Sequence, residues 1–179
     1  MIKSILLSGF GGQGILFSGR VLANAGLIGG YNVTWLPSYG PETRGGTSNC
    51  SVVISDRAIG SPLVTEPDIL IAMNTPAYDK FIGAVAAGGS VIMDSSLIDR
   101  GCSRSDVTEY KLPATEMADA DNLGGLSSMI LLGKLFGVLG IFDGATVADA
   151  VKRSISAKRP DLAERNMEAI RMGENGVDR

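Results

Sequence analysis

A glycine-rich turn, SGFGGQGIL at residues 8–16, constrains the fold of this chain more than any other feature. The residues before it, 2–8, are apolar and partly β-branched, which predicts a buried strand. Residues 14–29 then predict a helix that ends at a Gly-Gly pair, and residues 31–36 predict a second strand. A strand, a glycine turn, a helix and a strand in close succession are typical of a βαβ unit. The chain should therefore adopt an α/β fold.

Strands and helices continue along the rest of the chain. The sequence predicts strands at 49–55, 69–73, 90–94 and 107–111, and helices at 76–87, 114–120, 124–139, 146–156 and 160–172. The second and third strands are too close in sequence for a helix between them, so they should be antiparallel neighbours. Small residues on one stripe of the first helix, Gly19 and Gly26, should let it lie close to the sheet. We expect a single domain over residues 1–179: a Rossmann-like, mixed but mostly parallel sheet with helices on both faces.

Composition excludes several classes of function. The net charge of the 179 residues is -3 and no basic patch is visible, which argues against nucleic-acid binding. The two cysteines, Cys50 and Cys102, lie far apart, so we expect no metal or cluster held by this chain alone, and a reducing, cytoplasmic location. The absence of histidine removes Ser-His-Asp and Cys-His catalysis. The apolar stretch 126–142 is too interrupted for a membrane span, and we expect no signal peptide.

The glycine turn satisfies half of a dinucleotide-binding pattern. Gly9, Gly11 and Gly14 fit G-x-G-x-x-G, with Gly12 and Gln13 between the last two. Glycines there let a phosphate approach the N–H groups at a helix N-terminus. A nicotinamide enzyme also needs an acid or an arginine at the tip of the second strand, which here ends WLPS. An anion pocket, NAD binding and a purely structural tight turn therefore all remain open. The Gln13 amide could contact a ligand or tie down a neighbouring loop.

A second loop, rich in proline and glycine, follows the second predicted strand. It should neighbour the glycine turn, because we expect both to lie at the carboxyl ends of adjacent strands, where open α/β sheets bind ligands. Arg44 could pair with a phosphate or with a carboxylate across a subunit boundary, and the simpler alternative is a surface ion pair with Glu42. Asn74 follows the fourth strand and either ligates or caps the next helix. The candidate binding residues of this loop are Ser38, Tyr39, Gly40, Pro41, Glu42, Arg44, Gly45 and Gly46.

Taken together, these segments resemble the gamma subunit of the 2-oxoacid:ferredoxin oxidoreductases. Within that family, the sequences of the motifs resemble those of the 2-oxoglutarate-type enzymes most. The resemblance is carried by GFGGQG, TWLPSYGPETRGGTSNC and SPLVTEPDILIAMNTPAYDKF, and it extends over essentially the whole chain. It implies a complex that converts a 2-oxoacid to acyl-CoA, CO2 and reduced ferredoxin. It further implies alpha and beta subunits and a ferredoxin-like delta subunit, which would hold thiamine diphosphate, magnesium and 4Fe-4S clusters.

The resemblance gives this chain a binding role, on the side of the site that receives coenzyme A. The chain alone would then be inactive, with no catalytic or metal-binding residue and no cofactor of its own. Its candidate contacts to coenzyme A are the glycine turn (Gly9, Gly11, Gly12, Gln13, Gly14), the second loop and Asn74. The alternative from another class is a free-standing Rossmann-like nucleotide-binding module with a regulatory function.

Overall fold

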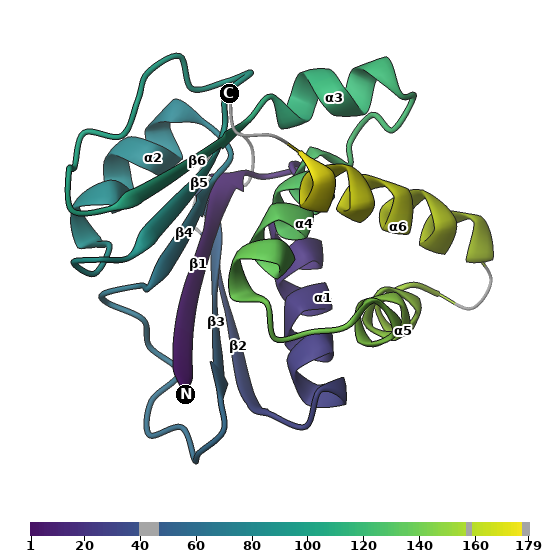
Figure 1. Ribbon diagram of the computed structural model, residues 1–179, viewed down its shortest axis with the longest axis horizontal. Coiled ribbons are helices and arrows are strands. Elements are labelled where there is room, and N and C mark those ends of the chain that lie inside the picture. The colour runs from purple at the N-terminus through teal and green to yellow at the C-terminus, as the bar shows by residue number, and fades with distance from the viewer. Residues whose placement is uncertain (40–46, 157–158, 177–179) are drawn as a thin grey trace.

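The computed structural model describes residues 1–39, 47–156 and 159–176, and contains a six-stranded sheet of order β2-β3-β1-β4-β5-β6 (Figure 1). The strands are β1 Ile2–Phe10, β2 Asn32–Tyr39, β3 Thr47–Ser55, β4 Ile69–Ala72, β5 Ser90–Asp94 and β6 Thr108–Leu112. The helices are α1 Ile15–Ile28, α2 Thr75–Phe81, the 3-10 helix η1 Ile82–Ala84, α3 Ala114–Ala120, α4 Ser127–Leu139, α5 Gly144–Ser154 and α6 Pro160–Asn175.

The sheet is mixed and mostly parallel, as predicted. β1, β4, β5 and β6 pair in parallel, whereas β3 runs antiparallel to both β1 and β2. The predicted antiparallel pairing of β2 with β3 is confirmed. The expectation that β1 and β2 are adjacent is wrong, because β3 returns between them and pairs with both.

Helices cover both faces of the sheet, which confirms that part of the prediction. On one face α1 and α4 contact the strands, α5 packs on α1, and α6 packs on α4 (Figure 1). On the other face α2 and η1 pack over β1, β4 and β5. Neighbouring strand residues therefore enter different cores: Ile5 and Leu7 join the α1 side, and Leu6 joins the α2 side.

Glycines bring α1 against the sheet, as the stripe of small residues predicted. A Cβ on Gly19 would lie 3.1 Å from Trp35 Nε1 and closer still to Cys50 Sγ. A Cβ on Gly26 would lie 2.6 Å from Val33 Cγ2. Any larger residue at either position would push the helix away from β2 and β3.

Element boundaries differ from the predictions by a few residues, except after β4. There α2 ends at Phe81 and tightens into η1, so the helix predicted to reach residue 87 is too long. Its last stretch is not helical because Val85 adopts extended backbone and Gly88 has a positive φ. None of the helices in the described part of the chain is both long and apolar enough to cross a membrane.

Candidate functional site

The turn between β1 and α1 needs three of its four glycines for reasons internal to the fold. Gly12 and Gly14 have φ of 96° and 80°, a region that L side chains rarely adopt. A Cβ on Gly9 would lie 2.7 Å from Oε1 of Gln13. Gly11 is different, because its φ is not positive and its Cβ would meet nothing within 4 Å. The fold of the described residues therefore gives no steric or conformational reason for glycine at position 11.

Two amide side chains lock this turn to the next one along the sheet edge. Gln13 Oε1 accepts hydrogen bonds from the Phe10 N–H (2.7 Å) and from Asn74 Nδ2 (2.9 Å). Asn74 Oδ1 accepts from the Ala77 N–H (2.9 Å) and so caps α2. The structure thus shows Gln13 tying down a neighbouring turn and Asn74 capping a helix; ligand contacts by these two side chains stay predictions.

Backbone donors remain free at this turn. The N–H groups of Gly11, Gly12 and Gly14 donate no hydrogen bond within the described residues, whereas the Gln13 N–H donates to the Phe10 carbonyl (3.2 Å). Gly14 is the N-cap residue of α1 and no side chain caps that helix. Free N–H groups and the positive end of the helix dipole favour an anion at this position.

The second loop leaves and re-enters the sheet beside the glycine turn. Thr47, the first residue of β3, pairs directly with Phe10 at the end of β1. Tyr39 pairs with Ser48 through its backbone, and Ser38 is exposed at the end of β2. The loop therefore meets the same edge as the turn even though β1 and β2 are not neighbours. The remaining predicted residues of this loop, Gly40, Pro41, Glu42, Arg44, Gly45 and Gly46, lie outside the described residues.

Two further residues at this edge were not predicted from the sequence. Lys80 Nζ lies 3.4 Å from Thr47 Oγ1, which places a cation from α2 where β3 begins. Ser128, in the first turn of α4, faces Gly14 so closely that a Cβ there would lie 2.6 Å from Ser128 Oγ. Lys80 stands in the segment MNTPAYDKF that the sequence singled out, but no local signal links Ser128 to the turn. We call the β1–α1 turn, Asn74, Lys80, Thr47 and Ser128 the rim.

Two ionisable side chains of the neighbouring strands, Cys50 and Asp94, are buried in the fold. Burial raises the pKa of the Cys50 thiol from 9.0 to about 12, only partly offset by a hydrogen bond from Trp35, so this thiol stays protonated and unreactive. Asp94 is fully buried, and its carboxylate accepts hydrogen bonds from Ser96 N–H (3.1 Å) and from Thr115 Oγ1 (2.6 Å). Within residues 1–39, 47–156 and 159–176, no group of three or more Cys, Asp or Glu residues is placed to hold a metal ion.

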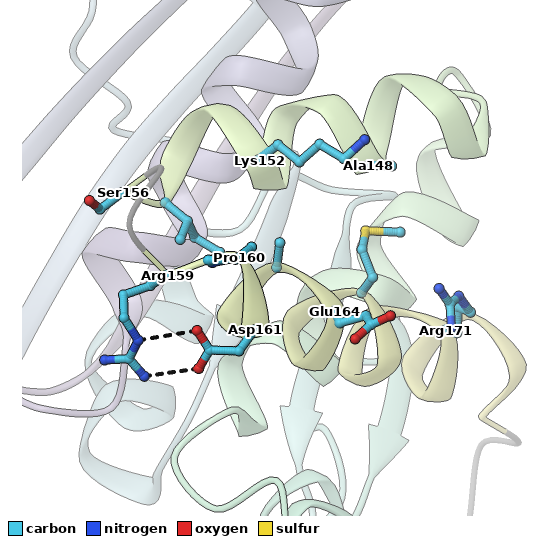
Figure 2. A pocket seen from close by; sticks show the side chains of 11 residues that line it. Ala148, Lys152, Ser156, Arg159, Pro160, Asp161, Glu164 and Arg171 are labelled. Carbon is cyan, nitrogen blue, oxygen red and sulfur yellow. Dashed lines mark hydrogen bonds and ion pairs between the residues drawn. The ribbon is translucent and has the colours of Figure 1, made fainter.

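A separate cavity of about 760 Å³ lies between α5 and α6, the helices of the outer layer (Figure 2). Its floor is largely apolar and includes Ile155 and Met167. At its end Arg159 and Asp161 form a two-point ion pair, with N···O distances of 3.2 and 3.0 Å. None of the predicted binding residues that the structure describes lines this cavity, so it is distinct from the rim.

Fold and rim together define a class: an α/β chain with free backbone donors at the carboxyl edge of its sheet and no described catalytic group there. Comparison with known proteins then identifies the family. The sequence pattern of the pyruvate ferredoxin/flavodoxin oxidoreductase family matches residues 4–175, and the chain belongs to this family.

Relatives of this chain carry the names of two substrate types. Ketoisovalerate oxidoreductase subunit VorA of Methanothermobacter marburgensis is 39% identical over 156 residues, which are 86% of this chain and 32% of VorA. The 2-oxoglutarate synthase subunit KorC of Methanocaldococcus jannaschii is also 39% identical, over 87% of this chain and 84% of KorC. This chain therefore spans about a third of the length of the VorA relatives and most of the length of KorC.

Solved structures confirm the fold. The gamma subunit of a keto/oxoacid ferredoxin oxidoreductase from Geobacter sulfurreducens superimposes with a TM-score of 0.81 at 27% identity, over 96% of this chain and 95% of that one. The 2-oxoglutarate:ferredoxin oxidoreductase of Magnetococcus marinus, solved with 2-oxoglutarate, coenzyme A and succinyl-CoA bound, gives 0.87 at 22% identity. It covers 97% of this chain but 30% of that longer chain. The resemblance to gamma-type chains is therefore confirmed.

Proposed function

We propose that this chain is the gamma subunit of a cytoplasmic 2-oxoacid:ferredoxin oxidoreductase, and that its rim binds coenzyme A. The complex oxidatively decarboxylates a 2-oxoacid, with 2-oxoglutarate the expected substrate, and passes electrons to ferredoxin. Thiamine diphosphate, magnesium and 4Fe-4S clusters belong to the alpha, beta and delta subunits. The whole chain, residues 1–179, acts as one domain in this assembly.

Several observations support the proposal. Relatives that match most of this chain are named as subunits of 2-oxoglutarate synthases, and the Geobacter neighbour is named as a gamma subunit. A protein in which 30% of the chain shares this fold was solved with coenzyme A bound. The rim of this chain offers donors for an anion and no described group that could perform the oxidation, which fits a division of labour between subunits.

Within such a complex, the residues of this chain would bind and orient coenzyme A. The N–H groups of Gly11, Gly12 and Gly14 would donate to phosphate oxygens, and Lys80 would add positive charge at the same edge. The Gln13–Asn74 pair would hold these donors in a fixed position, so that little ordering is needed on binding. Decarboxylation and electron transfer would take place on groups held by the partner subunits.

The observation that carries the proposal is the glycine at position 11. Nothing in the described fold requires it, and a methyl group there would project into open space beside the free N–H groups of the turn, where the proposed ligand would bind. Gly11→Ala in the assembled complex should therefore raise KM for coenzyme A several-fold without lowering the melting temperature of the chain. Gly83→Ala is the matched control, because Gly83 is also exposed, has no positive φ and has nothing within 4 Å of its Cβ.

The same preparation tests the rest of the proposal. Co-expression with candidate partner genes should yield a complex that reduces ferredoxin, with 2-oxoglutarate turned over faster than pyruvate or 2-oxoisovalerate. Loss of activity on omitting this chain is expected. An isolated chain that binds NADH tightly and ignores the partner subunits would instead establish the regulatory nucleotide-binding alternative.

A further inference from the structure

One edge of the sheet is open for pairing. β2 is the outermost strand in the order β2-β3-β1-β4-β5-β6, and β3 is the strand that pairs with it (Figure 1). Beyond this ladder, the backbone of β2 makes no hydrogen bond within the described residues. An edge strand in this state presents a row of free N–H and C=O groups, which another strand can bind.

The opposite edge of the sheet is protected, whereas this one is not. β6 carries Glu109 and Lys111, which lie 3.7 Å apart as an ion pair, and the Glu109 carboxylate accepts a hydrogen bond from the Cys102 N–H. Charged side chains and a covering segment are the usual means of preventing edge-to-edge pairing. The sequence of β2, NVTWLPSY, contains no charged residue, and Pro37 removes a single N–H from it. The charge pattern therefore favours β2 as the edge that pairs.

Large apolar side chains are exposed at the middle of β2. Trp35 and Leu36 are 38% and 37% exposed, and as neighbours in a strand they point to opposite faces of the sheet. The Trp35 ring lies against α1, where a Cβ on Gly19 would be 3.1 Å from its Nε1, and it still keeps this exposure. A further strand beside β2 would cover apolar surface on both faces at once.

We propose that β2 pairs antiparallel with β2 of a second copy of this chain, joining the two sheets into one across a two-fold axis. Self-pairing brings any charge on a strand close to its own copy, and β2 has no charge that would be repelled in this way. This self-complementarity favours a second copy over a strand of another sequence as the occupant, because a two-fold interface uses the same surface on both partners.

The length and sequence of β2 suit an axis at Trp35. Residues that face each other in such a pair must lie on the same face of the sheet, so Trp35 would lie opposite its own copy. Cross-strand aromatic pairs are among the stabilising ones. Thr34 would lie opposite Leu36, and Val33 opposite Pro37, so the missing N–H of the proline falls away from the centre of the ladder. This association goes beyond the proposed function, and in the assembled complex it would join two gamma subunits.

The test uses the purified full chain over a series of concentrations. Sedimentation should show a mass that rises to twice that of the chain. Trp35 is the single tryptophan, so its emission should shift to shorter wavelength as the dimer forms. Amide hydrogen exchange in β2 should slow in parallel. Leu36→Lys keeps the Trp35 reporter and should weaken the dimer more than about tenfold, because it places two like charges near each other across the axis.

Leu97→Lys is the matched control, because Leu97 is also an exposed leucine (43%) and lies outside the sheet. It should leave the dimer unchanged. A chain that stays monomeric, with Trp35 emission independent of concentration, would overturn the proposal. A dimer that Leu36→Lys and Leu97→Lys affect equally would also overturn it, as would Trp35 burial that requires another subunit. If Leu36→Lys does not fold, emission and hydrogen exchange of the unmodified chain decide the question alone.

Discussion

The position of α4, and with it the position of Ser128, depends on a backbone contact between α4 and α6. A Cβ on Gly133 would lie 2.8 Å from the carbonyl carbon of Ile170 and 3.0 Å from its Cα. A Cβ on Gly173 would lie 2.8 Å from the carbonyl carbon of Ile130. Since carbon atoms in contact lie about 3.5–4.0 Å apart, an alanine at either position must part the helices by roughly 1 Å.

Gly133→Ala should therefore destabilise the chain by about 1–3 kcal/mol, at the upper end because both partners are rigid helix backbone. For a chain of this size that corresponds to a fall in melting temperature of roughly 2–12 °C. Gly137→Ala is the control: it lies in the same helix, is exposed, and has nothing within 4 Å of its Cβ. It gains helix propensity without a clash, and should stabilise the chain by about 0.5–1 kcal/mol.

Urea unfolding of the purified chain at neutral pH measures both variants. The two substitutions are chemically identical, so the difference between them isolates the steric cost of the crossing. Gly173→Ala should resemble Gly133→Ala, and the double variant should lose less than the sum of the two, because the first methyl group already separates the helices. A Gly133→Ala midpoint at or above that of the unmodified chain would refute the packing described for α4 and α6.

Two further predictions concern the turn and the core. Gln13→Ala loses both hydrogen bonds accepted by Oε1 and should lower the free energy of unfolding, measured in urea, by about 1–3 kcal/mol. Gln13→Glu keeps an oxygen that can accept both hydrogen bonds, and should instead raise KM for coenzyme A because its negative charge repels the phosphates. Equal stability of the two variants would contradict the structural role of these two hydrogen bonds. Burial raises the pKa of Cys50 from 9.0 to about 12, so the unfolded chain releases this proton first and the Cys50 contribution to stability is lost as pH rises from about 9 to 12. Urea unfolding measures the difference in free energy of unfolding between the unmodified chain and Cys50→Ala, and this difference should shrink over that pH interval by up to about 1.4 kcal/mol per pH unit. A difference that stays constant with pH would contradict a buried thiol that is neutral.

Local chemistry made most of the fold predictable from the sequence. Apolar periodicity and the glycine and proline boundaries locate each strand and helix to within a few residues, except where α2 shortens into η1. Gly19 and Gly26 were predicted to bring α1 close to the sheet because they share one face of a helix, and the structure confirms this. The position of β3 between β1 and β2 was not predictable, since strand order depends on which pairs bury more surface and not on sequence spacing.

The candidate site was predictable only in part. The sequence marked the glycine turn, but an amide can donate and accept, so it left open whether Gln13 and Asn74 serve the fold or a ligand. The structure shows both amides engaged with each other. The approach of Ser128 to Gly14 joins segments far apart in the chain, and no local pattern reports it. Gly11 became informative only when the space around its Cβ was known.

The central claim is that the rim of this chain binds coenzyme A in a complex whose partners perform the redox chemistry. A structure of the assembled complex with coenzyme A bound measures this most directly. We expect a phosphate group of coenzyme A against the N–H groups of Gly11, Gly12 and Gly14, and the thiol directed into a partner subunit. Coenzyme A bound wholly within the other subunits, with this rim covered by protein, would contradict the account.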